Sequence, residues 1–169
     1  TVEHLLVMPV TPFEIMVSKI WAMAALVLGV SLFSLLVIVR GLLAVPIEGS
    51  LPLFAVGTAL HLFATTSLGI FLGTIARSMP QFGLLMMLVL LPLQVLSGSA
   101  TPRESMPEFV QFIMLAAPNT HFVMIAQAIL YRGASLALVW PQFLALVGIG
   151  ATLFSLSLAR FRKTLATMA

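Results

Sequence analysis

The sequence has no cysteine and no aspartate, and only 8% of its 169 residues are charged. Without cysteine the chain can form no disulfide, no thiolate metal site and no cysteine nucleophile. Without aspartate it lacks every Asp-dependent motif for phosphoryl transfer or magnesium binding, and no G-x-x-x-x-G-K-[ST] run is present. We therefore expect the chain to bind no nucleotide or other cofactor itself.

Residues that could carry out catalysis are also few. The three histidines are His4, His61 and His121; no two have metal-ligand spacing, and no H-E-x-x-H motif occurs. Ser99 lies between Gly98 and Ala100 but lacks the G-x-S-x-G context of a serine nucleophile. The sequence therefore predicts neither a metal site nor an enzyme.

Apolar residues, in contrast, are abundant. Hydrophobic residues make up 61% of the sequence, against about 45–50% in average soluble domains. A helix needs roughly 20 mostly apolar residues to cross a bilayer. The sequence therefore predicts an all-α polytopic membrane protein, although the third stretch is short. The four predicted transmembrane helices are residues 12–40, 53–76, 80–97 and 136–160.

The positive charges suit a membrane topology better than nucleic-acid binding. The net charge is +3, but beyond the group Arg160, Arg162 and Lys163 the cations are scattered between apolar runs. With a cytoplasmic N-terminus, five cations lie on the cytoplasmic side and three on the other, a modest positive-inside bias. We therefore expect both termini in the cytoplasm. The cytoplasmic group is Lys19, Arg77, Arg160, Arg162 and Lys163; the other group is Arg40, Arg103 and Arg132.

Helix-start signals predict the connecting segments. Thr11-Pro12-Phe13-Glu14 is a capping box with proline at the first helical position, and residues 101–104 and 105–108 repeat the pattern. Two apolar runs follow, 109–117 and 121–131, each too short to span the membrane. The second ends at Gly133, a residue suited to the C′ position of a helix. We expect residues 101–133 to form a re-entrant hairpin; the alternative is a pair of helices on the membrane surface.

A few polar and small residues lie inside the predicted spans. His61 and Gln94 are candidate residues of a transport pathway, or alternatively form ordinary hydrogen bonds between helices. Thr65, Gly69 and Gly73 follow one another at four-residue intervals. Such a stripe of small residues lets helix backbones approach closely, and packing within the chain is expected.

The N-terminal segment, residues 1–10, predicts a short amphipathic helix that is stopped by Pro9. Its apolar face consists of Val2, Leu5, Leu6 and Met8, and the residues partly turned away are Glu3, His4 and Val7. Such a helix either floats among lipid headgroups or docks on a cytoplasmic partner.

Two blocks of the sequence resemble the type-2 ATP-binding-cassette exporter permeases. Residues 3–14 with Lys19 resemble the E-x-L-L-x-x-P-V-x-P-x-E-x-x-x-x-K stretch of that family. The second block resembles the family's re-entrant outer hairpin and consists of Leu96-Ser97-Gly98, Met106-Pro107, Pro118-Asn119-Thr120-His121-Phe122 and Arg132-Gly133. Among these permeases the sequence is most similar to bacterial drug-export-type subunits.

The resemblance implies more than the composition does. Such permeases have six spans, so this chain would be a C-terminal segment whose first two spans lie upstream. Residues 1–10 would be the coupling helix, with Glu3, Leu5, Leu6 and Pro9 at the contact with a cytoplasmic ATPase. The implied partners are that ATPase, which hydrolyses the ATP, and a second permease subunit. The implied role is export of a hydrophobic or amphipathic substrate across the bacterial inner membrane.

Two other functions remain open from the sequence. One is a membrane scaffold or assembly protein that does not transport, and the other is a secondary transporter driven by an ion gradient. The five glutamates lie outside the core of every predicted span, which argues against an ion-driven carrier. The resemblance of residues 1–10 to a coupling helix argues against a scaffold.

Overall fold

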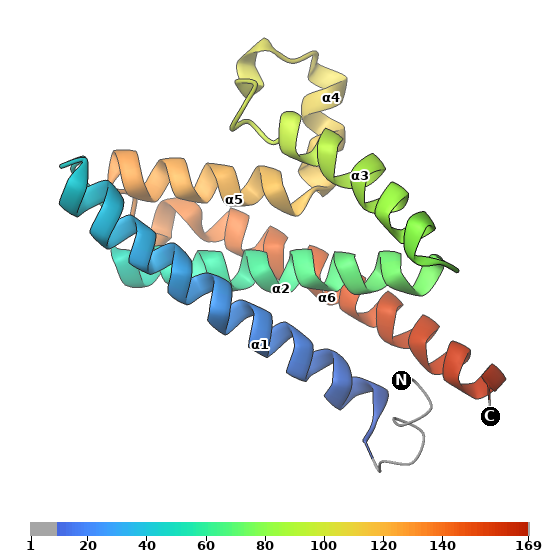
Figure 1. Ribbon diagram of the computed structural model, residues 1–169. Helices are drawn as coiled ribbons and strands as arrows, with labels where there is room; N and C mark the ends of the chain where they lie inside the picture. Colours follow the sequence, from blue (N-terminus) through green and yellow to red (C-terminus); the bar gives the residue numbers. More distant parts are fainter. Residues whose placement is uncertain (1–9, 169) are drawn as a thin grey trace.

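The computed structural model describes residues 10–168, and over this range the chain forms helices joined by short loops, with no strand (Figure 1). The all-α prediction is confirmed. The long elements are α1 (Pro12–Phe33), which runs on as the π-helix η1 (Ser34–Leu42), then α2 (Leu51–Ile75), α3 (Met79–Val95) and α6 (Leu136–Met168). The short elements are η2 (Arg103–Ser105), α4 (Glu108–Ile113), η3 (Met114–Ala116), α5 (Pro118–Ala126) and η4 (Gln127–Tyr131).

Helices occupy all four stretches that the sequence predicts as spans, but they differ in length. Three are long and apolar enough to cross a membrane: residues 12–42, 51–75 and 136–164. Helix α3, with 17 residues, is shorter. A fourth candidate is the pair formed by residues 108–116 and 118–131, which is bent by 98°. A broken span and a re-entrant loop both have this geometry, so the hairpin stays a prediction.

The start of α1 is the capping box that the sequence predicts. The Thr11 backbone N–H donates to Glu14 Oε2 at 2.7 Å, and the Glu14 N–H donates to Thr11 Oγ1 at 3.3 Å. Ser50 and Ser78 cap α2 and α3 in the same way, each accepting from the backbone N–H three residues later. All three helices also carry proline in their first turn, where its missing N–H costs nothing.

The two further capping boxes predicted at Thr101 and Ser105 are wrong. Pro102 and Pro107 take extended conformations, with ψ of 136° and 143°, and neither following helix has a side-chain cap. Met106 is extended as well, because a residue before proline is pushed out of the helical region. The two prolines therefore leave room for only the single 3₁₀ turn η2.

The bend between α4 and α5 has a proline at its centre. Pro118 is the first residue of α5, so this helix begins three residues before the predicted run 121–131. The same proline keeps Ala117 extended, at ψ 131°, and so ends the preceding turn. At the far end Gly133 has φ +61°, which confirms its predicted C′ role.

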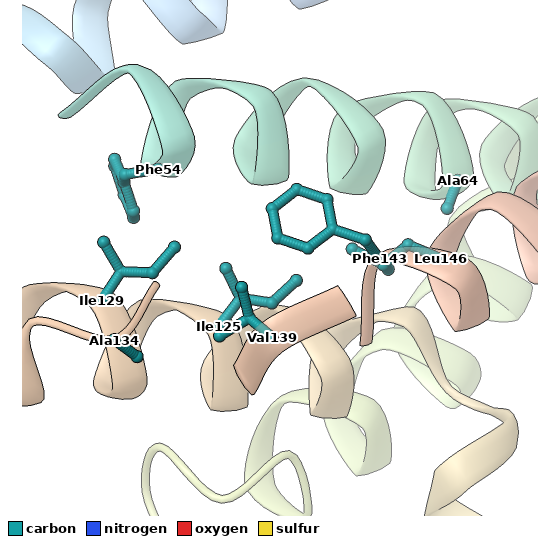
Figure 2. Packing of buried hydrophobic residues seen from close by; sticks show 8 residues of the cluster. All are labelled: Phe54, Ala64, Ile125, Ile129, Ala134, Val139, Phe143 and Leu146. Atoms are coloured by element: carbon teal, nitrogen blue, oxygen red, sulfur yellow. The ribbon is translucent and has the colours of Figure 1, made fainter. Parts of the chain in front are cut away.

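The buried core lies where α2, α5 and α6 meet (Figure 2). Phe54 and Ala64 of α2 face Ile125 of α5 and Phe143 and Leu146 of α6; Ile125 and Leu146 are fully buried. Many other apolar side chains point outward; Trp21, for example, is 76% exposed. This distribution suits a chain whose outer surface faces hydrocarbon.

Helices α2 and α6 pack closely through small residues. A Cβ added at Gly150 would lie 2.5 Å from two ring atoms of Phe63 and 3.4 Å from the Cα of Ala64. Two turns after Gly150, the buried hydroxyl of Ser157 donates to the backbone carbonyl of Ser67 at 3.2 Å. We call this contact the α2–α6 seam.

Candidate functional site

The predicted coupling residues Glu3, Leu5, Leu6 and Pro9 lie outside the described residues. The described chain begins at Val10, and α1 begins two residues later at Pro12. The segment expected to dock on a partner is therefore followed at once by a capped helix 22 residues long.

The end of the bundle at which α1 begins is cationic. A cavity of about 750 Å³ lies between the end of α2 and the last part of α6, and Arg77 and Arg160 both line it. None of its lining residues is acidic. Lys19 of α1 lies on the rim of a neighbouring groove at the same end. These are cations that the sequence assigns to one side of the membrane.

The predicted packing stripe of α2 makes no close helix contact within the described residues. Thr65, Gly69 and Gly73 line a groove of about 910 Å³ bounded by α1, α2, α3 and the end of α6. A Cβ added at Gly69 would meet no atom within 4 Å, and one at Gly73 would meet only Phe82 at 3.8 Å. Helix α2 instead approaches other helices closely on a different face, at the α2–α6 seam and at Gly57, where an added Cβ would lie 2.9 Å from Ile125 of α5.

The two candidate pathway residues both contact α5. The imidazole of His61 stacks on the ring of Phe122, with centroids 4.3 Å apart and planes 12° apart. The Gln94 side-chain oxygen accepts a hydrogen bond from Asn119 at 3.2 Å. The hydroxyl of Thr65 does not bond to the imidazole; it donates to the backbone carbonyl of His61 at 2.8 Å. His61 and Gln94 thus hold α2 and α3 against the start of α5.

A polar cavity that the sequence analysis missed lies at the opposite end of the bundle. Its volume is about 720 Å³, and the loop after α3, the bent pair and the start of α6 surround it. Arg103, Arg132 and Gln142 are among its lining residues. The sequence analysis assigned neither arginine to a binding site. The signal available was that each lies directly beside a turn residue, Arg103 after Pro102 and Arg132 before Gly133.

Comparisons with known proteins decide the family. The ABC-2 type transporter family matches residues 1–131, which include α1 to α5 and the predicted coupling segment. The chain belongs to the ABC-2 type transporter family. The resemblance seen in the two sequence blocks is thereby confirmed, and the family to which the chain belongs is one of membrane transporters.

Individual relatives agree with the family. The chain is 69% identical over all 169 residues to the inner membrane transport permease YhhJ of Escherichia coli K12, and equally to that of Shigella flexneri. It is 30% identical over 165 residues, 96% of its length, to the probable multidrug ABC transporter permease YbhR of Escherichia coli K12. The chain spans about half of these proteins, 45% and 44%. No solved structure matches it.

Proposed function

We propose that this chain is the C-terminal membrane portion of an exporter permease in the bacterial inner membrane. The permease moves a hydrophobic or amphipathic substrate out of the cytoplasm, using ATP hydrolysed by a separate subunit. The observation that carries the proposal is the family match over residues 1–131, which covers the predicted coupling segment and most of the helical bundle. The multidrug name of the 30% identical relative supports a hydrophobic cargo.

The start of α1 suits a mechanical link to a partner. A partner can shift a two-state membrane domain only if it binds the two states with different affinity. A segment docked on an ATPase can transmit a movement of the ATPase to the membrane helices only if the chain that follows the segment is ordered. Here the capping box and Pro12 fix the first turn of α1 within two residues of Val10. The cationic end of the bundle, with Arg77 and Arg160, is the end from which this link starts.

A second permease subunit is also part of the proposal. The groove lined by Gly69 and Gly73 has small residues on its floor and no side chain of the described chain close to Gly69. The chain also spans less than half of its relatives. Either helices from the rest of the protein or those of a second permease would complete the bundle beside this groove.

The test uses the complete parent protein, reconstituted in lipid with ATPase subunits encoded next to it. Leu5→Asp places a charge on the predicted docking face, so it should abolish the stimulation of ATP hydrolysis by the permease. Val7→Asp is the matched control, because the same charge lies on the face predicted to turn away, and it should keep most of the stimulation. Membrane insertion and thermal unfolding of both variants are measured alongside.

Two results would overturn the proposal. If no ATPase binds or responds to the folded permease, ATP-driven export is wrong, and an ion-driven transporter or a scaffold takes its place. If Leu5→Asp and Val7→Asp behave alike, the ATPase contact is not on the predicted apolar face.

A further inference from the structure

Two cavities of opposite character follow one another along a single face of α6. The polar cavity of about 720 Å³ is lined by Leu138 and Gln142 of this helix, and an apolar cavity of about 670 Å³ by Ala145, Ile149 and Thr152. These five residues recur every three or four positions, which places them on one helix face. Neither cavity belongs to the predicted coupling region.

The polar cavity holds two guanidinium groups that have no anionic partner among the described residues. Arg103 donates to the backbone carbonyl of Gln111 at 3.3 Å and to the sulfur of Met124 at 3.7 Å. Arg132 is exposed at the cavity wall and has no hydrogen bond or ion pair within the described residues. The carboxylate of Glu104, also exposed on this cavity, pairs with neither arginine. The cavity therefore has a net positive charge.

The hydrogen bonds that Arg103 and Gln142 make to Met124 in the polar cavity are weak. The side-chain nitrogen of Gln142 donates to the Met124 sulfur at 3.8 Å, so this one thioether is shared with Arg103. A thioether is a poor acceptor. The side-chain oxygen of Gln142 is buried and has no partner in the described part of the chain. The guanidinium N–H groups and the side-chain nitrogen of Gln142 would gain much stronger bonds from a phosphate, whose oxygens accept charge-assisted hydrogen bonds from guanidinium groups.

The distance along α6 from Gln142 in the polar cavity to the far end of the apolar cavity matches the depth of one leaflet. Besides α6 the apolar cavity is lined by Leu68 of α2, Leu93 of α3 and Ile113 at the end of α4. From Gln142 to Leu153 the helix rises by about 16 Å. Half of a bilayer's hydrocarbon core is about 15 Å. An acyl chain that begins at the polar cavity would therefore reach the bilayer midplane along this face.

Exposed aromatic side chains near the polar cavity indicate its depth in the membrane. Tyr131 is 71% exposed and Trp140 is 52% exposed, and each lies within two residues of a lining residue. Tyrosine and tryptophan are enriched where membrane meets water, at the depth of the headgroups. Basic pockets between membrane helices are known to bind anionic lipid headgroups.

The geometry points to a binding site for a membrane phospholipid on this face of α6. Arg103, Arg132 and Gln142 hold the phosphate headgroup, and the apolar cavity holds an acyl chain. The lipid comes from the leaflet on the Arg103 side, which the cation count predicts to be the outer one. This inference does not depend on ATP-driven export.

The headgroup part is tested by native mass spectrometry of the delipidated, complete parent protein titrated with three probes. Dioleoylphosphatidylglycerol has both phosphate and acyl chains, dioleoylglycerol lacks the phosphate, and glycerol 3-phosphate lacks the chains. Only the first should bind tightly. Arg103→Gln and Arg132→Gln should each weaken its binding about tenfold or more, because each removes charge-assisted hydrogen bonds. Arg40→Gln, an exposed arginine outside both cavities, is the control and should bind normally.

The acyl part is tested by filling the apolar cavity. A Cβ added at Gly148 would meet no atom within 4 Å, so Gly148→Leu should fold and place its side chain in the cavity. It should weaken phosphatidylglycerol binding several-fold, whereas Ala151→Leu, on an exposed position of the same helix, should not.

Each contrary result overturns a defined part of the inference. Equal binding of glycerol 3-phosphate would show a site for free phosphate, not for a lipid. Equal binding of dioleoylglycerol would exclude the headgroup contact. Equal weakening by Arg40→Gln would show unspecific surface attraction. Arg132 is exposed, so its variant tests the site even if Arg103→Gln fails to fold.

Discussion

Glycine-to-alanine changes at Gly150 and Gly148 should affect the stability of the protein differently, although only one residue separates the two glycines on α6. A Cβ at Gly150 would lie 2.5 Å from ring atoms of Phe63 and 3.4 Å from the Cα of Ala64. The Phe63 ring also contacts the ring of Phe154, with centroids 5.9 Å apart, so it has little room to withdraw. A Cβ at Gly148 would meet nothing within 4 Å.

The paired design isolates the steric contribution. Both changes gain the same helix propensity, about 1 kcal/mol in favour of alanine. Forcing an extra methyl group into a packed contact costs about 1–3 kcal/mol. The propensity gain cancels in the comparison, so Gly150→Ala should be less stable than Gly148→Ala by about 1–3 kcal/mol. Gly148→Ala itself should be as stable as the unaltered protein, or slightly more so.

The measurement is SDS-induced unfolding of the complete parent protein in mixed micelles, for the two variants and the unaltered protein. The free energy of unfolding is compared between the two variants at equal detergent composition. If Gly150→Ala proved as stable as Gly148→Ala, the α2–α6 seam would not be the close contact described above.

Four further predictions, one of them with a control variant, test other parts of the structure. Gly49→Ala should destabilise the protein by about 3 kcal/mol, because its Cβ would overlap a backbone carbonyl of η4, whereas Gly83→Ala, in open space, should not; unfolding in micelles measures both. Thr11→Ala should cost about 1 kcal/mol in the same assay, because it removes the side-chain cap of α1. Ser157→Ala should cost about 0.6 kcal/mol, the average for a hydrogen bond between membrane helices, and no loss would mean that the bond is not formed. His61→Leu should leave transport by the parent protein nearly normal, since the ring packs on an aromatic face; lost transport at normal expression would mark it as a pathway residue.

Features that depend on local sequence were predictable. An uninterrupted apolar run of about 20 residues identifies a membrane helix whatever its neighbours, so α1, α2 and α6 were predicted. The Thr11 capping box and the turn at Gly133 also depend only on adjacent residues. Helix α6 continues to Met168, beyond the predicted residue 160, because no glycine or proline follows Gly150 to end it.

The contacts between helices could not be predicted in this way. In a soluble helix the apolar face shows which side is buried, but these helices are apolar all round because lipid covers their outer faces. Two glycines of α2, Gly57 and Gly69, therefore cannot be told apart from the sequence. Gly57 meets Ile125 and Phe143 in the core, whereas Gly69 faces an open groove. Only the positions of the neighbouring helices separate the two.

The α2–α6 seam has a mechanical consequence. Because the two helices are joined by close contacts of small residues and a buried hydrogen bond, a force on one helix is carried by both, and the pair moves as one rigid unit. Sliding along the seam would push Gly150 against the Phe63 ring and break the bond between Ser157 and Ser67. Beside the groove at Gly69, the described residues present no such obstacle. Any rearrangement of this bundle is therefore easiest where α1 and α3 border the groove, while α2 and α6 keep their positions relative to each other.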